Sequence, residues 1–104
     1  MKVYRINIAD IAKQDIRDIK IYITNELQES VTALNITNAI LDAIDTLEQM
    51  PDRIALVKEK RLAANGIRPL YVKNYTVFFR IDETLDVVEI VRVLYSHRDW
   101  VSIL

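Results

Sequence analysis

Three runs of β-branched and aromatic residues in the C-terminal half constrain the fold of this chain more than any other feature. They span residues 67–72, 75–81 and 87–95 and consist largely of Val, Ile, Leu, Tyr and Phe. Such side chains suit a pleated, half-buried surface. Two residues separate the first pair of runs and five separate the second pair. Because a parallel crossover needs about a dozen residues, the sequence predicts an antiparallel meander of three strands.

The N-terminal half predicts a strand followed by a helix. Residues 2–8 alternate apolar and polar side chains, as a half-buried strand does. Apolar residues then recur every three or four positions, which predicts a helix that begins at an N-cap, Asp10, and ends near Glu29. Its apolar positions are Ala12, Ile16, Ile19, Ile23 and Leu27.

A second helix is predicted almost at once, with Ser30 or Thr32 as its cap and Pro51 as its stop. So short a connection favours an antiparallel hairpin. The hairpin and the meander each need a cover for an apolar face, and burying one Leu or Ile is worth roughly 1.5–3 kcal/mol. Residues 52–66 lack a clear period and predict a loop with one short turn of helix, closed by a turn at Asn65 and Gly66.

These elements predict an α+β fold. An N-terminal strand precedes an antiparallel helical hairpin, which packs on a C-terminal antiparallel three-stranded meander. A length of 104 residues fits one domain, so we expect residues 1–104 to form a single unit. The chain has no cysteine, which excludes disulfides and thiolate metal sites. No cluster of metal ligands and no phosphate-binding glycine loop is recognisable, so neither a metal nor another cofactor is expected.

Localisation and charge are less informative. No apolar run approaches the ~20 residues of a membrane span, and the N-terminus is too polar for a signal peptide, so we expect a cytoplasmic protein without a membrane partner. The formal net charge is −1, but residues 53–73 hold six basic residues and one acidic residue. Dedicated nucleic-acid binders are more often strongly basic. A solvated basic loop is therefore the favoured interpretation of this segment.

The order of these elements and several short motifs resemble the RelE/ParE superfamily of bacterial toxins over nearly the whole chain. The motifs are Leu47-x-x-x-Pro51, Arg68-x-Leu70-x-Val72, Asn74-Tyr75-x-Val77-x-Phe79 and Ile90-x-x-Val93-Leu94-x-x-x-Arg98-Asp99. The resemblance implies the toxin of a type II toxin–antitoxin module, of the kind that stabilises plasmids. It also implies a cognate antitoxin that wraps and silences the toxin. The expected assembly is either a homodimer of the toxin or a toxin–antitoxin hetero-oligomer.

The superfamily has two branches with different targets. The resemblance implies that members of the RelE branch cut messenger RNA in the ribosomal A site, and that members of the ParE branch poison DNA gyrase and are not nucleases. RNA cleavage needs cations and proton-transfer groups around the phosphate. Where RelE-like enzymes are implied to carry two lysines and an arginine, this chain has Pro69, Tyr71 and Thr76, and it ends without the expected tyrosine. The resemblance therefore favours the ParE-like branch.

No residue is a confident catalytic candidate. The alternative is a ribosome-dependent messenger RNA endonuclease with a non-standard centre, built from Arg68, His97 and Arg98. His97 is the only histidine, so it has no other histidine with which to form a metal site, and its imidazole would suit a general base. Arg68 shares a strand phase with core positions, and a structural role on a carboxylate or carbonyl is the competing interpretation.

The candidate partner-binding residues are Arg80, Arg92, Arg98 and Trp100. Arg80 and Arg92 fall in adjacent predicted strands, where pairing with an acidic residue competes with binding a partner. Trp100 would anchor an interface if it is exposed, because Trp is enriched among interface hot spots, and would belong to the core if it is buried.

Overall fold

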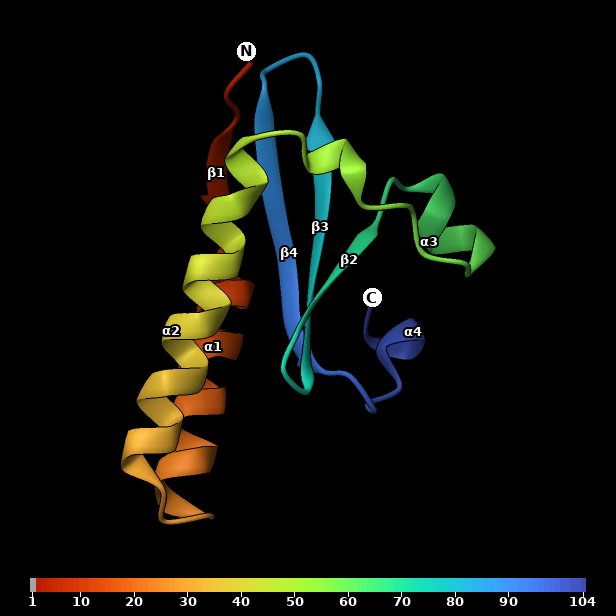
Figure 1. Ribbon diagram of the computed structural model, residues 1–104. Helices are drawn as coiled ribbons and strands as arrows, with labels where there is room; N and C mark the ends of the chain where they lie inside the picture. The colour runs from red at the N-terminus through yellow and green to blue at the C-terminus, as the bar shows by residue number, and fades with distance from the viewer. Residues whose placement is uncertain (1) are drawn as a thin grey trace.

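A four-stranded sheet carries helices on both of its faces (Figure 1). The protein is described here by a computed structural model that covers residues 2–104. Among these residues, no helix is both long and apolar enough to cross a bilayer. The elements are, in order, β1 Arg5–Ile8, α1 Asp10–Asn25, α2 Ser30–Asp45, the 3-10 helices η1 Thr46–Glu48 and η2 Pro51–Arg53, α3 Lys60–Ala64, β2 Arg68–Val72, β3 Tyr75–Asp82, β4 Val87–Tyr95 and α4 Trp100–Ile103.

The predicted meander is confirmed, and β1 extends it into a mixed sheet. The strand order is β1-β4-β3-β2, with β1 parallel to β4 and the other neighbours antiparallel. β1 begins at Arg5 rather than at the predicted Lys2, and its register with β4 places Arg5 opposite Val87. The long path between β1 and β4 satisfies the length that a parallel pairing requires, and the helical hairpin occupies part of it.

The hairpin of α1 and α2 covers one face of the sheet, as predicted (Figure 1). α1 buries Ala12, Ile19 and Ile23 there, and α2 buries Ala33, Ile40 and Ile44. The sheet contributes inward-facing residues of its two central strands, which alternate except where an irregularity in β4 between Ile90 and Arg92 adds one residue. These are Val77 and Phe79 of β3 and Val88, Ile90 and Val93 of β4.

The helix ends differ from those predicted. Ala9, not Asp10, is the N-cap of α1, because the Ala9 N–H donates to the Ile90 carbonyl at 3.0 Å and keeps that residue extended. Asp10 instead lies in the first turn, where a carboxylate suits the helix dipole. α1 ends at Asn25 rather than near Glu29, since the chain reverses through Gln28 at a φ of 53°.

Three further expectations about these helices were wrong. Leu27, placed in the apolar stripe, lies after the helix and is 54% exposed. The cap of α2 is Glu29, not Ser30 or Thr32. The Thr32 hydroxyl donates to the Glu29 carboxylate at 2.7 Å, so it serves the cap only indirectly. α2 ends at Asp45, and Pro51 begins η2 rather than terminating α2 directly.

A second, smaller core lies on the other face of the sheet and includes residues of α3 and α4. Its centre is Leu62, Ile67, Phe78 and Leu94. Within residues 52–66, where one helical turn was predicted, the chain forms α3 and the end of η2. The predicted turn at Asn65 and Gly66 is present, and Gly66 has the positive φ of 81° that favours glycine.

Candidate functional site

Two grooves flank the end of β4, one on each face of the sheet. The hairpin groove has a volume of about 670 Å³ and lies between the hairpin and the end of the sheet. It is lined by Asp15, Asp18, Ile19, Tyr22 and Ile23 of α1, by Leu27, Thr32 and Ile36, and by Asn74, Tyr75, Val93, Leu94, Tyr95 and Arg98. Its walls are mostly apolar, and Arg98 and Asp18 are its exposed charged residues.

Tyrosine rings dominate the sheet side of the hairpin groove. The rings of Tyr75 and Tyr95 meet edge to face, with centroids 5.8 Å apart. Burial raises the pKa of the Tyr75 phenol above its usual value, so Tyr75 stays a neutral donor across the physiological range. A groove of this kind suits apolar side chains that arrive with a hydrogen-bond acceptor.

The sheet groove lies on the opposite face and has a volume of about 720 Å³. It is lined by residues 54–58, by Pro69, Leu70 and Tyr71 of β2, and by Thr76, Phe78, Ser96 and Trp100. Its floor holds a hydroxyl pair, Thr76 and Ser96, with oxygens 2.8 Å apart. Among the described residues that line it, Lys58 is the only basic one.

The three residues of the alternative catalytic centre do not converge. Arg98 lines the hairpin groove, whereas His97 packs against the Tyr95 ring at 5.3 Å between centroids and lines neither groove. Arg68 pairs with Phe79, four residues along β3 from the Tyr75 that faces Tyr95, a separation of about 13 Å at ~3.3 Å per residue. The Arg68 guanidinium instead donates to the Ile54 carbonyl, which fastens the loop before α3 to β2.

Arg92 is held inside the protein by Asp15 of α1. Its Nε and Nη2 donate to the two Asp15 carboxylate oxygens at 2.7 and 2.9 Å, an arrangement in which both hydrogen bonds are charge-assisted. These bonds raise the pKa of the Arg92 guanidinium. The Val93 N–H donates to the same carboxylate at 3.0 Å, beside an irregularity in the pairing of β3 and β4. Asp15 thus fixes both Arg92 and the backbone next to it.

The other candidate partner-binding residues differ in exposure. Arg80 is exposed on β3 and lies opposite an acidic residue, Glu89 of β4, in the strand register. Arg98 is exposed after β4. Trp100 is half-buried, with its ring centroid 5.2 Å from that of Phe78, and its remaining surface lines the sheet groove. Trp100 therefore belongs to the second core and to an accessible surface at once.

A family model described as "ParE toxin of type II toxin-antitoxin system, parDE" matches residues 6–100. The chain belongs to this ParE toxin family. No curated protein matches it in sequence. A solved structure of the chromosomal ParDE toxin–antitoxin system from P. aeruginosa is similar, with a TM-score of 0.73 at 18% identity over 89% of this chain and 96% of that one.

Two RelE-type structures share the fold of this ParE-family chain. The RelBE2 toxin–antitoxin complex from Mycobacterium tuberculosis has a TM-score of 0.59 at 19% identity, covering 89% of this chain and 98% of the other. A free mutant of the E. coli toxin RelE has a TM-score of 0.68 at 10% identity, covering 96% and 90%. At identities this low, the structural similarity shows a common fold only. The RelE/ParE-like fold expected from the sequence is thereby confirmed.

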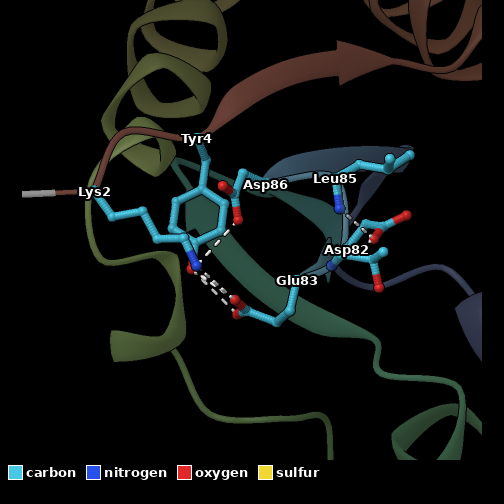
Figure 2. Close-up of polar contacts among 7 residues, drawn as sticks. Lys2, Tyr4, Asp82, Glu83, Leu85 and Asp86 are labelled. Atoms are coloured by element: carbon cyan, nitrogen blue, oxygen red, sulfur yellow. Dashed lines mark hydrogen bonds and ion pairs between the residues drawn. The ribbon is translucent and has the colours of Figure 1, made fainter.

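The sequence did not reveal a polar cluster between the N-terminal segment and the β3–β4 turn (Figure 2). The cluster lies at the opposite end of β3 and β4 from the two grooves. The Tyr4 hydroxyl donates to the Glu83 carboxylate at 2.9 Å, and Lys2 contacts Asp86 at 3.0 Å and Glu83 at 3.3 Å. The hydrogen bond to Glu83 raises the pKa of Tyr4, and that to Asp86 raises the pKa of Lys2. This cluster ties the N-terminal segment of the ParE-family chain to the β3–β4 turn.

Proposed function

We propose that this ParE-family toxin inhibits growth by poisoning DNA gyrase and that a cognate antitoxin silences it. The observation that carries the proposal is the composition of the sheet groove. On the outward positions of β2 it has Pro69 and Tyr71, and on β3 it has Thr76. Those are the positions at which the resemblance to RelE implies cationic side chains.

Physical chemistry makes that composition informative. Cleaving a phosphodiester develops negative charge that preorganised cations or hydrogen-bond donors must stabilise in a water-poor site. Lys58 alone, on a loop beside an open groove, is a weak substitute for several converging cations. Exposed apolar and aromatic groups around the groove, Leu56 and Tyr71, suit contact with a protein instead.

An antitoxin partner follows from the family, and the grooves favour particular ways of binding it. The hairpin groove is apolar and offers room for the nonpolar face of a helix. A strand added at a sheet edge would find an obstacle at β2, because Pro69 has no N–H to donate. β1, the other edge strand, contains no proline, so all of its residues have a backbone N–H, which favours strand addition there.

The test of the target is a supercoiling assay with purified gyrase and this chain. We expect the toxin to block supercoiling, the antitoxin encoded beside it to restore the activity, and induced cells to filament with a DNA-damage response. A variant with Tyr71 and Leu56 both changed to Ser should lose inhibition if the sheet groove contacts gyrase. Full supercoiling at excess folded toxin would contradict the proposal.

The alternative target is ribosome-bound messenger RNA, cut by a centre in which only His97 and Arg98 of the three candidates take part, because the Arg68 guanidinium donates to the Ile54 carbonyl. His97 and Arg98 are adjacent and exposed after β4, which leaves them free to meet a ribosomal substrate. Primer extension on messenger RNA after induction would reveal new ends at codon boundaries if this alternative holds. Those ends should then vanish in the H97A and R98A variants, whereas growth inhibition without new ends would exclude it.

A further inference from the structure

The outer side of α2 carries an apolar stripe that the protein itself leaves uncovered. Val31, Leu34 and Leu41 are 72%, 50% and 41% exposed. Together with the exposed residues Asn38 and Asp45, they recur at intervals of three, four, three and four. This is the seven-residue spacing of a helix that packs against another helix, with Asn38 in the middle of the seam. The buried face of α2, which includes Ile40 and Ile44, is separate and already contacts the sheet.

We propose that this stripe is a self-association surface, on which α2 of a second copy of the chain packs in the antiparallel direction. A two-fold axis would pass near the middle of the stripe, between residues 36 and 38. In such an isologous contact each patch meets its own copy, so the Val31 end of one helix meets the Leu41 end of the other. The inference concerns assembly and does not depend on the proposed cellular target.

Asn38 favours a second copy over an unrelated apolar helix. Near the axis the two Asn38 amides lie close together, and each can donate to the carbonyl of the other. A purely aliphatic partner would bury the Asn38 amide without a hydrogen bond, which is costly. A single polar residue in an otherwise apolar seam is also a known means of setting helix register and oligomeric state.

The charges favour the antiparallel direction. Asp42 and Asp45 stand at one end of α2, and the helix has no basic residue. A parallel pair would bring four carboxylates together, whereas an antiparallel pair sends each acidic end to the N-terminal end of the other α2, where the dipole favours negative charge. The N-terminal end of α2 lies near the exposed Lys20 of α1 and also carries the exposed Glu26 and Glu29. The gain from the antiparallel direction is therefore the separation of the four carboxylates at the C-terminal ends.

Sedimentation equilibrium on the purified chain tests the association. A two-helix contact is smaller than a standard interface, so we expect a weak dimer, visible at roughly 100 µM. At that concentration the wild type should have an average mass clearly above that of one chain, and L34D should have the mass of one chain. The matched control is I21D on α1, since Ile21 is 54% exposed and lies outside the stripe, and it should stay dimeric.

Cross-linking tests the direction, and the absence of cysteine from the chain makes it clean. N38C places its thiols near the axis, so a short bismaleimide should link them. V31C places them at least about 15 Å apart along the helix axes, at ~1.5 Å per residue, and should not be linked. A monomeric wild type, equal dissociation of I21D and L34D, or equal linking of V31C and N38C would each overturn the proposal.

Discussion

Asp15 accepts three hydrogen bonds from β4, two from Arg92 and one from the Val93 N–H. Only 9% of the residue is exposed. We predict that Asp15→Ala lowers the free energy of unfolding by about 3 kcal/mol, because it leaves a part-buried guanidinium and a buried N–H without their acceptor. Urea unfolding followed by circular dichroism measures the loss.

Asp18 provides the matched control for Asp15. It lies three residues further along α1, is exposed, and accepts a hydrogen bond from Gln14 at 2.7 Å. Asp18→Ala should change the free energy of unfolding by no more than about 0.5 kcal/mol. Similar losses for both variants would mean that the contacts of Asp15 with β4 contribute little.

Tyr4 gives a prediction for alkaline solution. Its pKa is raised above the ordinary value of 10.0 by the hydrogen bond to Glu83. A group whose folded pKa is raised stabilises the protein below its unfolded pKa, and that stabilisation is lost as the pH rises through the folded pKa. The wild type should therefore unfold at higher urea than Tyr4→Phe at pH 8, and the gap should shrink above pH 10. The pKa of Lys2 is raised in the same cluster, so the stabilisation from Lys2 is also lost as the pH rises.

A Glu83 variant tests whether the hydrogen bond to Glu83 is the source of the stabilisation by Tyr4. Glu83→Gln removes the charge that holds the Tyr4 proton, so its effect and that of Tyr4→Phe should not be additive at pH 8. Additive losses in the double variant would show that the two side chains stabilise the fold independently.

At the scale of the elements, the link between η1 and η2 contains a strained backbone position. Met50 has a φ of 49° and is 61% exposed, so its side chain offers little in return for a left-handed conformation. That conformation costs a residue with a Cβ roughly 1–2 kcal/mol. Glycine avoids this cost, but it loses more conformational entropy on folding, which offsets part of the gain. Met50→Gly should therefore raise the free energy of unfolding by about 0.5–1 kcal/mol.

The control for Met50 is an equally exposed residue with ordinary backbone geometry. Leu85 in the β3–β4 turn is also 61% exposed and does not have a positive φ. Leu85→Gly should lower the free energy of unfolding, since glycine there brings only entropy loss. Thermal unfolding of the two variants side by side distinguishes relief of strain from a general effect of glycine.

The sequence predicted an element well where a long run of residues specifies it. It predicted the end of an element poorly where that end depends on residues distant in the sequence. The β4 run at 87–95 was placed correctly because its nine residues are mostly Val, Ile, Leu and Tyr and turn residues precede them. The start of α1 was misplaced because a bond from Ala9 to Ile90, in another part of the chain, decides it. α3 has five residues, too few to show a helical period, and its cap comes from Glu59, which accepts from the Leu62 N–H at 2.7 Å.

The candidate site shows the same limit. A resemblance based on Arg68, Arg98 and their neighbours sufficed to name the family. It did not show that Arg92 is engaged by Asp15, because the two lie 77 residues apart and no local pattern links them. Both grooves arise where segments distant in sequence meet, so single-sequence spacing carried no signal for them.

At the scale of the whole molecule, the sheet separates a large core from a small one. The large core lies beneath the hairpin, and the small one lies beneath α3 and α4. The Arg61 guanidinium donates to the Val101 carbonyl at 2.8 Å, which joins the two short helices into one unit. Segments with few buried apolar contacts open at a lower free energy than the rest of a protein. We therefore expect this unit to open by itself while the hairpin stays closed.

Native-state hydrogen exchange tests this expectation. The Ala63 and Leu104 amides, bonded to Glu59 and Trp100, should exchange through a local opening, whereas the Ile44 amide in α2 should require a larger one. Leu62 is 2% exposed, so Leu62→Ala should weaken the small core by roughly 2–5 kcal/mol. Its effect should be confined to the first two amides, because α2 does not take part in that core.

The contrasting variant is Ile40→Val, which trims the large core at a fully buried position. It should lower protection throughout the protein by about 0.5–1.5 kcal/mol, because the hairpin core opens only when the whole fold does. If Leu62→Ala instead lowers the protection of all three amides equally, the two cores form one cooperative unit. In that case the sheet groove cannot be remodelled without unfolding the hairpin, and a partner would bind it as a rigid surface.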